Sequence, residues 1–248
     1  MKYIRLPAVL IAFLLFTNTF YSCKSYPPAF KVADFYSEYN DAIDFINEDS
    51  YVGLMPKSSE EAAVNTGIIF YPGGMVEYEA YLPLMTLCAE KGAACFIVKM
   101  PLNFAFMDKK AADKFPKLYP EISHWYLAGH SLGGAMAASY ISDNYDNFDG
   151  LILLASFSTK DISKTNLKVL SIYGSKDGVL NMDKYHKNKS NLPAESADGT
   201  GLTEKIIEGG NHAQFADYGE QKGDQIPDIS GEEQLRITAA EIINWAGL

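Results

Sequence analysis

Short apolar runs alternate with amphipathic runs along most of the chain. Most of the apolar runs carry no polar face, as expected of strands buried on both sides in the middle of a parallel sheet. We predict strands at residues 51–55, 66–71, 93–100, 124–128, 150–155, 169–174 and 205–208.

The segments between these strands are predicted to be helices. Residues 78–91 have an amphipathic helical pattern, with an apolar stripe of leucine and methionine. The alternation with strands predicts further helices at 108–118, 132–144, 182–189 and 232–246. Residues 34–48 fit either a short helix or an extended edge, because aromatic residues stand there among acidic ones. The repeated alternation predicts an α/β fold with a mostly parallel central sheet and helices on both faces.

One connection bears on how open the fold is. Between the strands predicted at 150–155 and 169–174, residues 156–168 number only 13 (168 − 156 + 1). A helical cap needs more chain than this, so we expect no cap domain and an open site.

Composition limits the domain count and the class of partner. With 248 residues and 48% hydrophobic content, the chain can form one sizeable core, and we expect one folded domain at 33–248. Acidic residues outnumber basic ones, 31 against 21, and no basic cluster occurs. A nucleic-acid partner is therefore not expected.

The amino end has the pattern of an export signal. Lys2 and Arg5 precede the apolar run 6–16, which is too short for a confident membrane span and suits a signal-peptide core. Cys23 follows a small residue, Ser22, as in bacterial lipoprotein signals, where the cysteine is lipidated.

We therefore interpret residues 1–22 as a lipoprotein-type signal peptide and 23–32 as the anchor cysteine and a tether. An uncleaved anchor and ordinary secretion are the alternatives, because Phe20 and Tyr21 are bulkier than usual before such a cysteine. Each version predicts an exported protein, and the first predicts a cell-envelope lipoprotein held to the membrane by Cys23.

The strongest candidate for chemistry is the hexapeptide at 129–134, Gly-His-Ser-Leu-Gly-Gly. It lies where the strand predicted at 124–128 ends and the helix predicted at 132–144 begins. This is the context of a nucleophile elbow, a sharp turn that exposes a serine and needs small residues two positions to either side. Ser131 is the candidate nucleophile, with Gly129 and Gly133 in the small positions.

A serine hydroxyl needs a base, and the base needs a partner that orients it. Of four histidines, His212 follows the last predicted strand in a loop where an active site should lie. His124 begins a strand before the serine, His186 falls in a predicted helix, and the side chain of His130 is expected to diverge from the site.

The acid should also follow a strand, between the serine and the histidine. Asp177 comes after the strand 169–174, 46 residues beyond Ser131 (177 − 131) and 35 before His212 (212 − 177). Asp161 and Asp183 are weaker candidates, because one precedes its strand and the other enters a helix.

Acyl transfer also requires N–H donors for the oxyanion of the transition state. The backbone N–H of Leu132, just after the serine, is one expected donor. The turn after the strand 66–71 should supply the other, from Gly74 or, as the alternative, from Met75.

At these four stretches the chain resembles the serine α/β-hydrolase superfamily, and in it the small cap-less branch related to dienelactone hydrolases. The stretches are Phe70-Tyr71-Pro72-Gly73-Gly74, the hexapeptide 129–134, Gly174-Ser175-Lys176-Asp177-Gly178, and 209–215. The resemblance implies an α/β-hydrolase fold, a triad of Ser131, Asp177 and His212, and an oxyanion hole at Gly74 and Leu132.

The resemblance has one departure, and it bears on the substrate. Dienelactone hydrolases proper use a cysteine nucleophile, whereas this elbow carries serine, which favours ordinary esters over lactones. We expect carboxylic ester hydrolysis through an acyl-enzyme on a small-molecule substrate. Lipase or acyltransferase activity and a catalytically silent binding lipoprotein are the alternatives. No metal or cofactor is expected, since no His or Cys pair has ligand spacing and no P-loop occurs.

Overall fold

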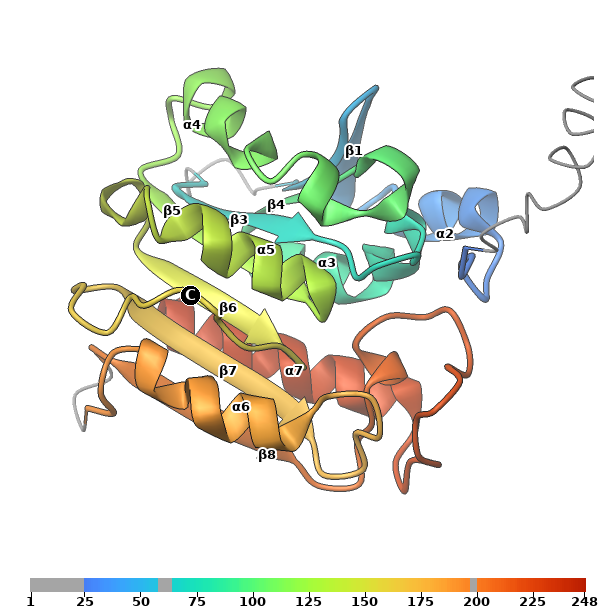
Figure 1. Cartoon of the computed structure of the whole chain (residues 1–248). Coiled ribbons are helices and arrows are strands. Elements are labelled where there is room, and N and C mark those ends of the chain that lie inside the picture. Colours follow the sequence, from blue (N-terminus) through green and yellow to red (C-terminus); the bar gives the residue numbers. More distant parts are fainter. Residues whose placement is uncertain (1–24, 58–63, 197–199) are drawn as a thin grey trace, which may run out of the picture.

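An eight-stranded sheet runs through the middle of the molecule, in a computed structural model that describes residues 25–57, 64–196 and 200–248 (Figure 1). The strand order is β1-β2-β4-β3-β5-β6-β7-β8. The strands are β1 (Ile43–Glu48), β2 (Tyr51–Pro56), β3 (Thr66–Tyr71), β4 (Ala94–Val98), β5 (His124–His130), β6 (Gly150–Leu154), β7 (Lys168–Gly174) and β8 (Leu202–Ile207). The segment predicted to be a signal peptide, residues 1–22, and Cys23 lie outside the described residues.

The sheet is mostly parallel, as predicted. β4, β3, β5, β6, β7 and β8 pair in parallel, and β1 and β2 add an antiparallel pair at one edge. β3 lies between β4 and β5 and is buried at all six positions, which confirms its prediction as a central strand. Residues 34–48, left open between helix and strand, contain both: α2 (Val32–Tyr39) and then β1.

Helices cover both faces of the sheet (Figure 1). α3 (Leu82–Ala89) and α7 (Gly231–Ala246) pack together on one face. α4 (Phe115–Leu118), α5 (Leu132–Ile141) and α6 (Met182–Asn188) lie on the other. Each face has its own apolar core, and complete burial of a large apolar side chain contributes about 1.5–3 kcal/mol.

Two predicted helices begin later than expected. The prediction for 108–118 was wrong over most of its length: α4 has four residues and follows a 3-10 turn, Ala111–Lys114. Likewise α3 follows the 3-10 turn Tyr78–Tyr81. In both cases a proline, Pro116 or Pro83, occupies the second α-helical position. Proline has no N–H to donate and is tolerated only in the first turn of a helix.

The connection from β6 to β7 confirms the expectation of no cap. Residues 155–167 are all described and contain neither helix nor strand. The carboxyl edge of the sheet is therefore not covered by an inserted domain.

The polypeptide is fixed to the fold from its first described residues. Tyr26 forms a parallel bridge with Val76. Its N–H donates to Met75 O at 2.7 Å, and its carbonyl accepts from Glu77 N at 3.0 Å. These contacts begin seven positions (33 − 26) before the predicted start of the domain at residue 33.

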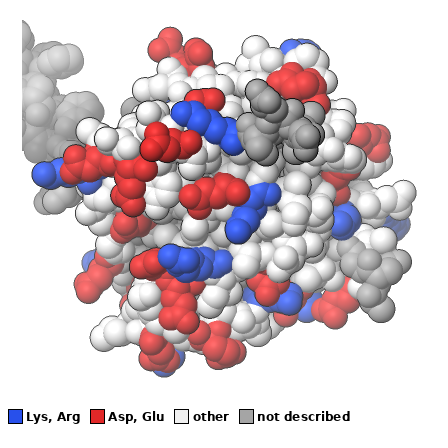
Figure 2. All heavy atoms as spheres, turned by 180° about the vertical axis from the view of Figure 1, so that it is seen from behind, with Lys and Arg blue, Asp and Glu red and all other residues white. Residues whose placement is uncertain are grey.

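The surface carries charges of both signs. On the face seen in Figure 2, acidic and basic side chains are interspersed, and the basic ones form no continuous area. Within the described residues, no helix combines the length and the apolar content needed to cross a bilayer. The same residues hold no cluster of three or more His, Cys, Asp or Glu side chains suited to a metal ion.

Candidate active site

Ser131 lies at a strained turn between β5 and α5. Its backbone angles are φ 52° and ψ −120°, outside the regions that side-chain-bearing residues prefer. The turn requires glycine two residues later, because a Cβ on Gly133 would lie 2.1 Å from Tyr71 O. A Cβ on Gly129 would lie 2.6 Å from the carbonyl carbon of Gly133. The predicted elbow is therefore present.

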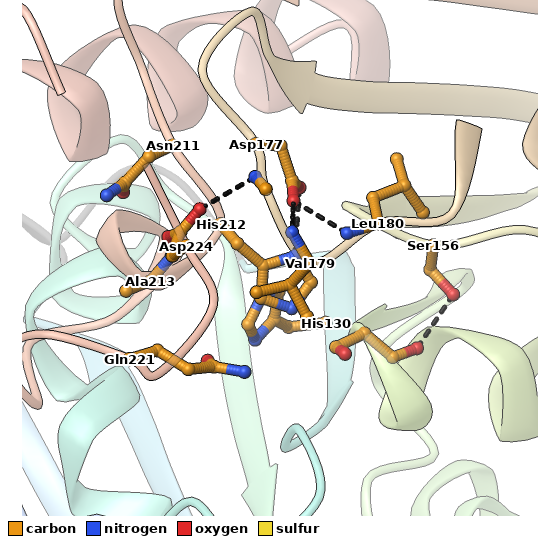
Figure 3. Close-up of polar contacts among 12 residues, drawn as sticks. His130, Ser156, Asp177, Val179, Leu180, Asn211, His212, Ala213, Gln221 and Asp224 are labelled. Carbon is orange, nitrogen blue, oxygen red and sulfur yellow. Dashed lines mark hydrogen bonds and ion pairs between the residues drawn. The ribbon is translucent and has the colours of Figure 1, made fainter. Parts of the chain in front are cut away.

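The end of β6 holds this turn in place. Ser131 N–H donates to Leu154 O at 2.9 Å. The Ser156 hydroxyl, just beyond β6, donates to Ser131 O at 2.7 Å (Figure 3). Both backbone polar groups of Ser131 are thus satisfied, and its side chain is left for chemistry.

Asp177 and His212 form a buried pair at the carboxyl ends of β7 and β8. His212 Nδ1 lies 2.8 Å from Asp177 Oδ2. The other carboxylate oxygen accepts from the N–H groups of Val179 at 2.8 Å and Leu180 at 2.7 Å (Figure 3). Since a carboxylate only accepts, Nδ1 carries the proton of a neutral His212 ring, which leaves the lone pair on Nε2.

The Nε2 atom of His212 is buried and has no hydrogen-bond partner. Among the described residues, no group, the Ser131 hydroxyl included, forms a hydrogen bond to it. Such contacts are often open in unliganded enzymes and tighten with substrate bound. A buried nitrogen without a hydrogen-bond partner lowers the stability of the fold, so its presence calls for an explanation. Its free lone pair can accept a proton.

A buried glutamine fixes the backbone beside His212. Gln234 of α7 accepts from Asn211 N–H at 2.9 Å and donates to Asn211 O at 2.8 Å. Gln234 is fully buried, and its own carbonyl accepts from the Thr238 hydroxyl. The histidine loop is thereby tied to the last helix.

Asp224 joins the loop of the acid to the loop of the base. One of its oxygens accepts from Gly178 N–H at 2.9 Å, next to Asp177. The other accepts from Ala213 N–H at 2.9 Å, next to His212 (Figure 3). A single carboxylate therefore sets the spacing of the two loops.

His130 does not diverge from the site, so that expectation was wrong. Its ring lies 4.6 Å from the His212 ring, centroid to centroid (Figure 3). Its Nδ1 is 2.8 Å from the Tyr81 hydroxyl, which also accepts from Gly73 N–H at 2.8 Å. Burial, and secondarily the charge of His212, lowers the pKa of His130 well below its usual range, so His130 is neutral.

The two expected oxyanion donors lie in adjacent segments. A Cβ on Gly74 would meet Leu132 Cδ2 at 2.9 Å, so the turn after β3 touches the start of α5. Leu132 is the first residue of α5, where N–H groups have no partner within the helix. Met75, the alternative, already donates its N–H to Asn103 O at 2.8 Å. This favours Gly74.

The other candidates lie outside this constellation. His124 pairs with Asp149 at 3.2 Å on the surface, and His186 lies on an exposed position of α6. Asp161 bonds to Ser163 in an exposed loop, and Asp183 lies in the first turn of α6.

A cavity of about 660 Å³ lies next to the site but is separate from it. Asn211, Ala213 and Gln214 of the histidine loop line it, together with side chains of α3 and α7. Neither Ser131 nor His212 lines it.

Sequence reasoning did not identify Gln234, Asp224 or the packing of His130. Gln234 had a signal: with Thr238 and Ile242 it stands at intervals of four on the buried face of α7, where a polar residue needs a partner. Asp224 had none, since it is one of several acidic residues in a loop. The contact of His130 depends on how β5 and the histidine loop meet in space.

Comparison with known proteins agrees with this architecture. The family model described as "Alpha/beta hydrolase family" matches residues 67–236. A search of curated proteins found no match. A predicted CIB-like hydrolase from Thermoplasma acidophilum has a similar crystal structure, with a TM-score of 0.54 and 19% identity over 82% of this chain and 97% of that one.

Two structures of another protein are similar in the same way. Est1E from Butyrivibrio proteoclasticus has a TM-score of 0.58 and 14% identity, over 84% of this chain and 100% of that one. The same protein with ferulic acid bound matches with a TM-score of 0.58 and 13% identity, over 83% of this chain and 100% of that one. At these identities the likeness shows the fold, and the family match covers most of the sequence. The chain therefore belongs to the alpha/beta hydrolase family.

Proposed function

We propose that the protein is a serine hydrolase that cleaves carboxylic esters through an acyl-enzyme. The observation that carries the proposal is the buried His212 ring, with Nδ1 bonded to Asp177 and Nε2 free, beside a strained serine turn. A neutral histidine oriented by a carboxylate is what an otherwise weak serine nucleophile requires.

The steps follow from these positions. His212 Nε2 takes the proton of Ser131 as Ser131 Oγ bonds to the ester carbonyl carbon, and the carbonyl oxygen becomes an oxyanion facing the N–H groups of Gly74 and Leu132. The C–O bond to the alcohol then breaks, and His212 returns the proton to the leaving alcohol. Water attacks the acyl-enzyme with His212 again as base, releasing the carboxylic acid and restoring Ser131. Loss of one oxyanion donor costs about 3 kcal/mol of barrier.

The likeness to Est1E, for which a ferulic acid complex is described, is compatible with an ester substrate. Lipase or acyltransferase chemistry is the second candidate, favoured by the uncapped edge of the sheet, where an alcohol could replace water. A binding-only protein is the third. It gives no reason for a strained serine beside a histidine with a free nitrogen.

We also propose that the protein is exported and held at a membrane by Cys23. The support is the sequence of residues 1–23, with its two basic residues, its apolar run and the cysteine that ends it. No cofactor enters this mechanism.

Nitrophenyl acetate, butyrate and palmitate would test the proposal, with wild-type protein, Ser131→Ala and the control Ser142→Ala at the end of α5. We expect hydrolysis of the short esters by the wild type and by Ser142→Ala, and a loss of about 10³-fold or more in Ser131→Ala. Equal rates in wild type and Ser131→Ala would contradict the proposal. Rates on palmitate compared with acetate separate lipase from esterase activity.

A further inference from the structure

Three large apolar side chains stand exposed in the connection that follows β4. They are Leu102, 78% exposed, Phe106, 56% exposed, and Met107, 50% exposed, and we call them the apolar rim. Exposed apolar residues scattered singly are ordinary, but three within six positions of one loop make that loop a candidate interaction surface.

The rim lies beside the oxyanion turn. Asn103, between Leu102 and Phe104, accepts a hydrogen bond from Met75 N–H at 2.8 Å. Met75 O in turn accepts from Tyr26 N–H at 2.7 Å. The amino-terminal segment, the oxyanion turn and the rim are therefore three adjacent segments linked by hydrogen bonds. In Figure 1 they gather at the carboxyl edge of the sheet, on the side where α2 lies.

Two unfavourable features occur together in this loop: a strained backbone and apolar side chains exposed to water. Leu102 and Asn103 both have left-handed backbones, with φ of 52° and 59°. Asparagine tolerates this conformation, so the backbone strain lies at Leu102. The end of β3 also holds the loop: the Tyr71 hydroxyl donates to Lys109 O at 2.8 Å and accepts from Ala112 N–H at 3.0 Å. The fold thus keeps apolar side chains in water on a fixed loop.

The chain before Tyr26 indicates what covers the rim. A residue spans at most about 3.6 Å, so an attachment at Cys23, three residues earlier, is no farther than about 11 Å from Tyr26. An uncleaved apolar segment would also enter the membrane close by. One acidic residue, Asp108, separates the rim from two lysines, Lys109 and Lys110. Apolar side chains with a net basic charge beside them suit an anionic lipid surface.

We propose that the apolar rim inserts into the surface of the lipid bilayer to which the amino terminus is attached, so that the site at Ser131 faces the membrane. This rests on the proposed membrane attachment and deepens the proposed function: the substrates it favours are esters presented at a lipid surface. A protein held by a freely moving tether would have no preferred face. Here the hydrogen bonds of Tyr26 fix the point at which the chain leaves the fold.

The test places a tryptophan on the rim of the full-length chain. Phe106→Trp is compared with wild type and with Leu118→Trp, whose parent side chain is 54% exposed at the end of α4. Each protein is reconstituted into vesicles of phosphatidylcholine and phosphatidylglycerol, with or without bromine on the acyl chains. Trp125 and Trp245 give the same background in all three proteins.

We expect brominated lipid to quench the added fluorescence of Phe106→Trp roughly twofold and to leave that of Leu118→Trp unchanged. Equal behaviour of the two variants would overturn the proposal, and so would failure of the wild-type chain to associate with vesicles. Quenching does not depend on catalysis. A protein that is inactive in the ester assay but whose rim tryptophan is quenched would therefore contradict the hydrolase proposal and still support insertion of the rim.

Discussion

At the scale of single residues, two buried histidines share the site and differ in their partners. His212 faces the Asp177 carboxylate, whereas His130 faces the phenol of Tyr81. Burial raises the pKa of Tyr81, so its hydroxyl keeps its proton and can donate a hydrogen bond to His130. A neutral ring next to His212 adds no repulsion to the imidazolium that forms during catalysis.

The lowered pKa of His130 predicts a dependence of stability on pH. The unfolded chain binds a proton at this histidine near pH 6.5, while the folded protein does so only at much lower pH. The unfolded state therefore holds more protons below pH 6.5, and the free energy of unfolding falls as pH falls, by up to about 1.4 kcal/mol per pH unit. The stabilisation is fully present above pH 6.5.

Urea unfolding of wild type and His130→Gln between pH 7.5 and 5 measures this effect. The variant lacks the titrating group while keeping an oxygen for Tyr81, so its stability should fall less steeply below pH 6.5. The groups facing His130, which are Tyr81 and His212, are common to both proteins. Parallel curves would show that His130 is protonated equally in both states.

The sequence predicted the Asp177–His212 pair because both follow parallel strands, whose carboxyl ends meet at one edge of a sheet. That hydrogen bond is present, whereas the catalytic roles of the two residues stay predictions. The partners of His130 could not be predicted, because Tyr81 precedes it by 49 positions and only the folded chain brings the two together.

At the scale of elements, the ends of six strands were predicted to within two residues, whereas β8 begins three residues earlier than predicted and β1 lies in a segment left open between helix and strand. The starts of two helices were not predicted. A strand buried on both faces has a continuous apolar run that few other elements share, as β3 shows. The start of a helix depends on single residues such as Pro83 and Pro116. The positions of the loops after β7 and β8 depend on hydrogen bonds to side chains such as Asp224. No periodic pattern in the sequence identifies such side chains.

Asp224→Ala should loosen the two loops that Asp224 joins. It removes both acceptors for Gly178 and Ala213 N–H, and we expect a loss of about 1–3 kcal/mol in the free energy of unfolding. Misplacement of His212 relative to Ser131 should lower kcat/KM by about 10- to 100-fold. Thermal unfolding and ester hydrolysis measure the two effects.

Asp228→Ala is the matched control in the same loop. Its carboxylate is exposed and pairs with Lys176 at 3.2 Å on the surface, a contact worth about 0–1 kcal/mol. If Asp224→Ala behaved like Asp228→Ala in both assays, the bridge between the loops would have no functional importance.

At the scale of the whole molecule, the site lies on one edge of an uncapped sheet, and the chain leaves the fold at that same edge. The open edge was predictable from the short connection 156–168. The fixed position of Tyr26 was not, because a bridge to Val76 lies 50 positions (76 − 26) away in sequence and involves backbone atoms alone. The arrangement is consistent with substrates that approach from a lipid surface.

The central claim is that Ser131 is a nucleophile activated by His212. The most direct measurement is labelling with a fluorophosphonate probe, followed by mass mapping of the modified peptide, in wild type, Ser131→Ala, His212→Ala and the control Ser142→Ala. We predict one adduct on Ser131 in wild type and control, none in Ser131→Ala, and labelling slowed about 10³-fold or more in His212→Ala. An unlabelled wild type, or an adduct on another residue, would contradict the account.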